Sequence, residues 1–225
     1  MPAPLMHIAL AIIALKGPFN NTNKKDFILG TSFPDIRYLK VIDRKQTHVK
    51  DIVWNRIDQK QSNFKLGYLF HSWIDNIFDE FIRNNDIPKK LQSKTYSTQS
   101  FKFFADKIIY NKMKSSFAEV DCYFDDINKE ELSFGIQKEA VMQWHKFLKK
   151  YCFQGNLYVT AQEFALLPNT TLESIAAAIA QMNKQNDQAS KIVDDFYDFA
   201  CKKITEIKLL NSEQKSNPLL NSHIT

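Results

Sequence analysis

Residues 64–83 read FKLGYLFHSWIDNIFDEFIR, and this stretch decides the fold. Its apolar side chains recur every three or four residues, as in an α-helix, and they cover so much of the circumference that the helix is predicted to be buried. His71 and Asp75 interrupt the apolar surface. Because they stand four residues apart, they face the same side of the helix and can approach one cation together.

A buried carboxylate needs a partner, because burying an unpaired charge costs several kcal/mol or more. For Asp75 the partner is either a metal ion that it shares with His71 or a hydrogen-bonding group on a neighbouring helix. An isolated pair of this kind is more often explained by hydrogen bonds. The choice therefore depends on whether the rest of the chain supplies further ligands.

The composition predicts a helical domain. The chain has 225 residues and is 44% hydrophobic, which suffices for the core of one soluble globular domain. Glycines (5) and prolines (7) are few, and no stretch alternates apolar and polar residues, so β-sheet is not expected. The predicted fold class is all-α, a compact multi-helix bundle. We expect residues 1–210 to form a single helical domain and residues 211–225 to form a flexible tail.

The charge of the chain is weakly positive. Its 30 basic and 25 acidic residues are well mixed and give a formal net charge of +5. This bias is too weak to indicate nucleic-acid binding, but it is compatible with an anionic surface or a phosphate-containing substrate. No feature of the sequence indicates an oligomeric state.

The cysteines and the N-terminal segment bear on location. Cys122, Cys152 and Cys201 form no Cys-x-x-Cys motif, so neither a disulfide framework nor a thiolate zinc site is indicated. A reducing, cytoplasmic location is expected, and secretion by a non-classical route is compatible with the sequence.

Residues 5–15, LMHIALAIIAL, have the length of the apolar segment of a signal peptide. We interpret them as a buried first helix, because they contain His7 and no Lys or Arg precedes them. No stretch reaches the roughly 20 apolar residues of a membrane span.

The remaining elements are predicted from caps, glycines and helical periodicity. A helical run at 27–29 is expected to be capped by Asp26 and ended by Gly30, and a stiff Pro-Asp turn is expected to present Asp35. His48 is placed in the first turn of a helix that continues to residue 57. The other predicted helices span residues 61–84, 99–113, 132–151, 157–167, 170–183 and 189–210, with an irregular acidic segment at 115–131.

Five potential metal ligands follow one another in the first third of the chain. In order they are His7, Asp35, His48, His71 and Asp75. Together with the words GTSFPD at 30–35 and GYLFHSWID at 67–75, they resemble the pattern of the zinc-dependent phospholipase C family and, more distantly, of the S1/P1 nucleases. The resemblance covers roughly residues 1–85, where the candidate ligands are found.

The resemblance implies an all-helical fold and a role for each of the five residues. Asp35, His48, His71 and Asp75 would hold one zinc ion, and two imidazoles with two carboxylates suit that metal. In the family the counterpart of Asp75 bridges to another zinc, which the counterpart of His7 and the N-terminal amine also hold. One ion is therefore expected, and a second is compatible with the pattern. Asp75 is the residue on which catalysis is expected to depend.

The sequence also departs from the family pattern. The family completes a further metal site with a histidine shortly after the HxxxD motif and with a later HxxxE motif. Asp79 and Glu80 stand where that histidine is expected, and no HxxxE occurs in the chain. His145 is followed four residues later by Lys149. We therefore expect the third site to be absent or rebuilt with carboxylates such as Asp79.

These observations leave three hypotheses for function. The first is a zinc-dependent phosphoesterase of phospholipase C type, in which metal-activated water attacks a phospholipid headgroup or another small phosphodiester. The second is a non-catalytic binding protein on the same scaffold, with a residual structural zinc. The third is an unrelated helical protein in which the five residues are ordinary polar partners.

Four further side chains near the pattern have two interpretations each. Trp54 and Trp73 either line a substrate cleft or belong to the core. Arg37 and Lys40 either contact a substrate phosphate or lie solvated at the surface.

Overall fold

The computed structural model describes residues 2–52, 61–87, 98–154, 180 and 186–216. Within these ranges the elements of regular structure are all helices, which confirms the all-α prediction. In chain order they are α1 (Pro4–Lys16), α2 (Lys24–Ser32), the 3-10 helix η1 (Phe33–Leu39), α3 (Arg44–Thr47), α4 (Asn63–Asn84), α6 (Thr98–Ala118), the 3-10 helix η3 (Asp121–Asp125), α7 (Lys129–Leu132), α8 (Lys138–Leu148), the π-helical turn η4 (Lys149–Phe153) and α11 (Asn186–Ser216). No described helix is both long and apolar enough to cross a membrane.

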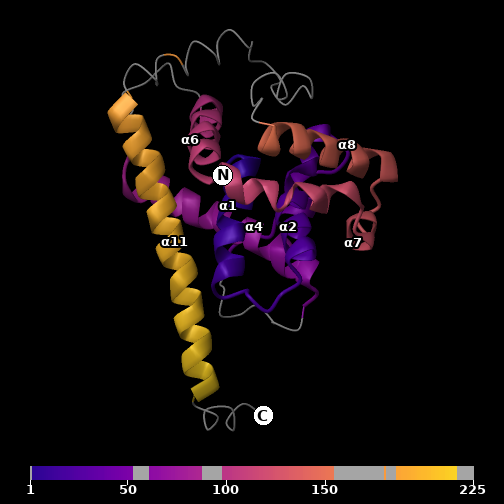
Figure 1. Cartoon of the computed structure of the whole chain (residues 1–225), viewed down its shortest axis with the longest axis horizontal. Coiled ribbons are helices and arrows are strands. Elements are labelled where there is room, and N and C mark those ends of the chain that lie inside the picture. The colour runs from indigo at the N-terminus through magenta and orange to yellow at the C-terminus, as the bar shows by residue number, and fades with distance from the viewer. Residues whose placement is uncertain (1, 53–60, 88–97, 155–179, 181–185, 217–225) are drawn as a thin grey trace.

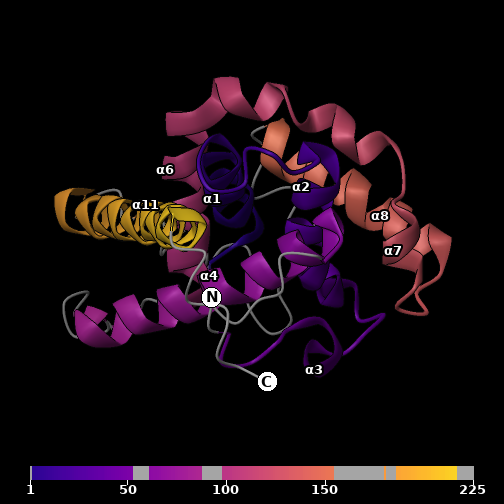
Figure 2. The ribbon, with the colours of Figure 1, turned by 90° about the horizontal axis from the view of Figure 1, so that it is seen from below.

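Helices α1, α2 and α4 form the centre of the molecule, and the later helices surround them. Figure 1 shows α6 and α8 on one side of this centre and the long helix α11 along another. In Figure 2, which looks at the molecule from below, α4 crosses under α1 and α2, and α3 lies at the periphery. Most of α1 is buried, in agreement with the apolar pattern of residues 5–15.

Two glycines allow α2 and α4 to cross in close contact. A Cβ atom on Gly30 would lie 2.0 Å from the carbonyl oxygen of Phe64, and one on Gly67 would lie 2.0 Å from that of Phe27. The prediction that Gly30 ends the helix is therefore wrong: α2 continues to Ser32, because this glycine is needed for backbone approach and not for a turn. The cap is also different, since Asn23 and not Asp26 precedes the helix and accepts a hydrogen bond from its first turn.

The beginning of α1 is capped by a residue from a distant helix. Ala3, at the N-cap position, offers no side-chain hydrogen bond. Instead, the buried carboxylate of Asp106 on α6 accepts hydrogen bonds from the backbone N–H groups of Leu5 at 3.2 Å and Met6 at 3.1 Å, and from the hydroxyl of Tyr151 at 2.9 Å. Burial raises the pKa of Asp106 to about 7, against the effect of these three donors. Asp106 thus satisfies N–H groups that a helix leaves without partners.

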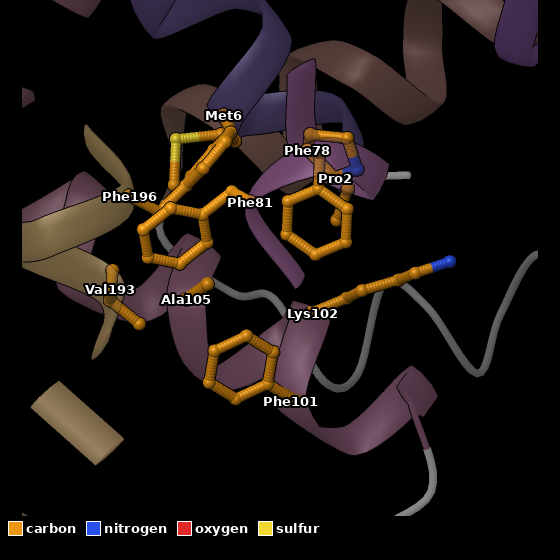
Figure 3. Close-up of a pocket in the computed structure, with 10 residues that line it drawn as sticks. Pro2, Met6, Phe78, Phe81, Phe101, Lys102, Ala105, Val193 and Phe196 are labelled. Carbon is orange, nitrogen blue, oxygen red and sulfur yellow. The ribbon is translucent and has the colours of Figure 1, made fainter. Parts of the chain in front are cut away.

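Apolar side chains attach α11 to the rest of the bundle. The ring of Phe196 meets those of Phe78 and Phe81, with centroids 5.0 Å and 5.4 Å away. Figure 3 shows this contact, with the chain of Lys102 running along its edge and its nitrogen pointing away from the rings. The cavity among these side chains measures only about 10 Å³, so it has no room for a ligand.

The structure corrects several predicted boundaries. The segment expected to be irregular at 115–131 contains the end of α6, then η3 and α7. The helix predicted at 132–151 begins only at Lys138, because Gly135 adopts a φ of 75° in the turn after α7. The tail was predicted to start at residue 211, but α11 runs from Asn186 to Ser216. The helices predicted at 157–167 and 170–183 lie outside the described residues, apart from residue 180.

Candidate metal centre

The five candidate ligands come from four parts of the fold and lie together. His7 is on α1, Asp35 on η1 and His48 directly after α3, while His71 and Asp75 are on α4. They form two overlapping groups, in each of which one ligand atom per residue lies within 4.8 Å of the others: His7 with His71 and Asp75, and Asp35 with His48 and His71. The sequence predicted their proximity. The resemblance placed Asp75 in the second set and made it the bridge to the ion of His7, whereas His71 is the residue that the two groups share.

The spacing of the ligand atoms suits a small cation. The Nε2 atoms of His71 and His48 are 3.2 Å apart. The two oxygens of Asp75 lie 3.2 Å from Nε2 of His7 and 3.5 Å from Nε2 of His48. With zinc–ligand bonds of about 2.0–2.2 Å, neighbouring ligand atoms in a tetrahedral site are about 3.3–3.6 Å apart. The side chains therefore have nearly the separation that a zinc site requires.

Both ring nitrogens of His7 face oxygen atoms, although a neutral ring can donate to only one of them. Its Nδ1 faces the carbonyl oxygen of Ala3 at 3.3 Å, and its Nε2 faces the carboxylate of Asp75 at 3.2 Å. Burial lowers the pKa of His7 to about 4, so the ring is neutral near pH 7 and carries a single N–H. With an ionised Asp75, one of the two contacts then joins two acceptors. A cation near Nε2 removes this conflict, because Nδ1–H then donates to Ala3.

The other two histidines are also oriented by their Nδ1 atoms. Nδ1–H of His71 donates to the carbonyl oxygen of Thr31 at 2.8 Å, and Nδ1 of His48 lies 2.9 Å from the hydroxyl of Thr47. Burial is the largest cause of the pKa shift in both residues. It lowers the pKa of His71, and it lowers that of His48 to about 2. Neutral imidazoles whose outer nitrogen is held in this way direct Nε2 toward a metal.

The carboxylate of Asp35 has one buried oxygen without a hydrogen-bond partner. Arg37 donates to Oδ1 at 3.3 Å, but Oδ2 accepts no hydrogen bond within the described part of the chain. Only 1% of Asp35 is exposed. An unsatisfied buried acceptor is costly, and it is uncommon in folded proteins. Because Asp35 belongs to the group with His48 and His71, a metal ion is the partner that this position fits.

His48 is held in place without the helix that the sequence predicted. Residues 48–52 are not helical, so the placement of His48 in a first helical turn is wrong, and residues 53–57 lie outside the described ranges. Instead, α4 positions the segment. The hydroxyl of Tyr68 donates to the carbonyl oxygen of Gln46 at 3.1 Å, and the N–H of Val49 donates to the hydroxyl of Ser72 at 3.1 Å.

A cavity of about 310 Å³ leads to the group. His48 and Asp75 form part of its wall, so the cavity borders the candidate centre. Arg44 also lines it and donates to Asp75 at 3.2 Å. Burial raises the pKa of Asp75, which is 3% exposed.

Other residues singled out in the sequence lie elsewhere. Asp79 is exposed and belongs to neither group of candidate ligands, so it does not rebuild a further site with them. Trp73 packs against Phe70 at the edge of the core, while Trp54 is outside the described residues. Arg37 pairs with Asp35 and lies over the ring of Tyr38, and Lys40 is exposed.

A second buried histidine–carboxylate pair was not predicted. Nε2 of His145 lies 2.8 Å from Glu131, and both side chains are buried. Glu131 also accepts from the N–H of Asn128 at 2.8 Å, as the last residue of a capping box. The spacing of Asn128 and Glu131 could have revealed the cap, but the partnership with His145 depends on the packing of α7 and α8.

Comparison of the chain with protein-family models, with curated proteins and with solved structures found no match.

Proposed function

We propose that His7, Asp35, His48, His71 and Asp75 bind one or two zinc ions and that the resulting centre hydrolyses phosphate esters. The observation that carries the proposal is the buried oxygen of Asp35 that has no partner among the described residues and lies beside two neutral imidazoles. A set of nitrogen and oxygen ligands without thiolates suits zinc. Because His48 and Asp75 lie in the wall of a cavity, the position favours a catalytic ion over a purely structural one.

The residues of the candidate centre and of the cavity have separate roles in the proposed reaction. The three imidazoles and the two carboxylates would hold the metal, and the carbonyl oxygen of Thr31 fixes the ring of His71. When bound, zinc supplies activation of water and neutralisation of the charge on the phosphate oxygens. Arg44 is half-exposed at the cavity and can donate to a phosphate oxygen. In the overall reaction a phosphodiester and water give a phosphomonoester and an alcohol.

A structural zinc without catalysis is the alternative. One observation favours it: Asp35, His48 and His71 come from η1, the segment after α3, and α4, so that a single ion held by them would tie three parts of the chain together. The absence of an HxxxE motif from the sequence points the same way. The cavity that reaches His48 and Asp75 supports the enzymatic proposal instead.

Metal content and hydrolysis, measured on the same preparations, test the proposal. The protein is purified without chelator, its zinc is determined by mass spectrometry, and hydrolysis of bis(4-nitrophenyl) phosphate is followed. We expect one or two zinc ions per chain in the wild type and weak hydrolysis that chelator abolishes. Asp75→Asn should remove the activity, since it keeps the shape of the side chain and removes its charge.

The control variant is Asp194→Asn, an exposed carboxylate of α11 that pairs with Lys112. It should keep the zinc content and the rate of the wild type. Zinc bound without hydrolysis of this ester would support the structural alternative. A wild-type protein that binds no zinc would show that the five side chains are ordinary polar partners.

A further inference from the structure

The cavity beside the candidate metal centre has a strongly positive wall. Arg44, Lys45 and Lys50 all line it, and they come from one short segment around His48. Among the residues that the structure describes, the carboxylate in the wall is that of Asp75, which already contacts His7 and Arg44. Three cations therefore face one carboxylate that is engaged with other groups.

The two lysines are available to a ligand. Lys45 and Lys50 are exposed, and neither forms an ion pair with a carboxylate in the described ranges. Arg44 differs from them because it donates to Asp75, although half of its side chain is exposed. Lys45 and Lys50 thus add positive charge to the cavity, and no described carboxylate forms an ion pair with them.

The described wall of the cavity has no aromatic ring that could recognise a cationic headgroup, and its carboxylate, Asp75, is engaged with His7 and Arg44. Quaternary ammonium groups are bound by the faces of Trp, Tyr or Phe, or by carboxylates. The residues described in this wall include no such aromatic ring, and Val49 is its apolar member. A positively charged group that entered here would meet Lys45 and Lys50 without a compensating partner.

We propose that this cavity selects phosphate esters that carry a second negative charge, such as a carboxylate or another phosphate, and disfavours those with a cationic group. The inference rests on the proposed function, because it places the scissile phosphate at the end of the cavity formed by His48, Asp75 and Arg44. The second anionic group then lies against Lys45 and Lys50. The volume of about 310 Å³ is at the lower end of ligand-binding cavities, so the favoured substrate is small.

Three small phosphate esters that differ at the far end test this selectivity. They are 2-phosphoglycolate, which ends in a carboxylate, ethyl phosphate, which ends in a methyl group, and phosphocholine, which ends in a quaternary ammonium. Their dissociation constants are measured by calorimetry with zinc-loaded protein, and their inhibition of bis(4-nitrophenyl) phosphate hydrolysis is measured in parallel. Two exposed charge contacts of ordinary strength predict that 2-phosphoglycolate binds about tenfold more tightly than ethyl phosphate. Phosphocholine should bind most weakly.

The variant that removes both charges is Lys45→Gln/Lys50→Gln. It should reduce the preference for 2-phosphoglycolate to within about twofold, because the ligand's carboxylate loses both partners. The zinc content should be unchanged, since neither lysine belongs to the candidate ligands. The matched control is Lys112→Gln/Lys191→Gln. It changes two exposed lysines that pair with Asp194 and Asp195. It should keep the order of the three ligands.

The outcomes separate the two proposals. Equal affinities, phosphocholine as the tightest ligand, or no binding of 2-phosphoglycolate would overturn the selectivity while hydrolysis of the aryl ester still stood. A preference that survives in Lys45→Gln/Lys50→Gln would show that other groups cause it, and would also overturn the inference. Failure of the proposed function would appear separately, as missing zinc or missing hydrolysis in the wild type.

Discussion

The imidazole ring of His7 lies flat against that of His71, with centroids 3.8 Å apart and an angle of 8° between their planes. Two imidazolium cations would repel each other in this position, so the stack requires that at least one ring be neutral. Burial supplies this condition, since it lowers the pKa of both histidines. The stack also keeps both Nε2 atoms beside Asp75, in the group that could hold a metal.

The zinc-free protein should lose stability as the pH falls. In the unfolded chain His7 takes up a proton near its ordinary pKa of 6.5, whereas in the folded protein its pKa is about 4. The unfolded state therefore binds more protons between these values, and the free energy of unfolding decreases as the pH falls through this window. For His7 alone the full loss is about 3 kcal/mol.

Urea unfolding of the zinc-free protein at about pH 7, 6 and 5 measures this effect, because each pKa difference appears as a slope of free energy against pH. His7→Gln cannot take up the proton, so its free energy of unfolding should depend less steeply on pH. Equal slopes for the wild type and His7→Gln would contradict the assignment of the effect to this residue.

Zinc should stabilise the folded protein through Asp35. A ligand at one hundred times its dissociation constant adds about 2.7 kcal/mol to the free energy of unfolding. We expect zinc to raise the melting temperature of the wild type and chelator to reverse the change. Asp35→Asn should respond much less, because it lacks the charged oxygen that has no partner within the described residues. The same zinc-dependent rise in both proteins would remove Asp35 from the ligand set.

The glycine contacts between α2 and α4 should be sensitive to a single methyl group. In Gly30→Ala the new Cβ would lie 2.0 Å from the carbonyl oxygen of Phe64, so the two helices must separate. Overpacking of this kind costs about 1–3 kcal/mol, and here backbone has to move. In the control, Gly17→Ala, the new Cβ would lie 3.7 Å and 3.8 Å from the carbonyl oxygens of Ile13 and Ala14, which is ordinary contact. Chemical denaturation of the two variants should separate them, and equal stability would contradict the close crossing.

Removal of the Asp106 carboxylate should weaken the start of α1. In Asp106→Asn the amide group brings a donor to a position where three donors already converge. An unsatisfied buried group costs about 1–3 kcal/mol, and Tyr151→Phe, which removes one donor, should cost about 1 kcal/mol. Because α1 carries His7, zinc affinity measured by competition with a chelator should fall more in Asp106→Asn than in Tyr151→Phe. Unchanged affinity in both would show that His7 does not depend on this cap.

Local sequence patterns predicted the features that one helix determines. The spacing of His71 and Asp75 on a buried helical face follows from periodicity, and the boundaries of α4 differ little from the predicted 61–84. The resemblance that their order carries also predicted that His7, Asp35 and His48 would lie near this pair. Whether the group binds zinc stays a prediction, as does the resemblance to the phospholipase C family.

Features that depend on contacts between distant residues could not be predicted. Gly30 was interpreted by its local tendency to end a helix, but Phe64 determines its role. Residues 48–52 are not helical, and Tyr68 and Ser72 hold Gln46 and Val49 on either side of His48 through hydrogen bonds. The capping carboxylate of Asp106 gives no local signal either, because α1 begins 102 residues before it in the sequence.

This separation has a consequence for how the protein is made. The ribosome completes all five candidate ligands before it adds Asp106 and Tyr151, which hold the beginning of the helix that carries His7. A nascent chain that ends shortly after α4 therefore contains every ligand but not the groups that fix the first of them. We therefore expect assembly of the complete candidate centre to await synthesis of residues 106–151, and a metal ion that arrives earlier would meet only a partly formed site.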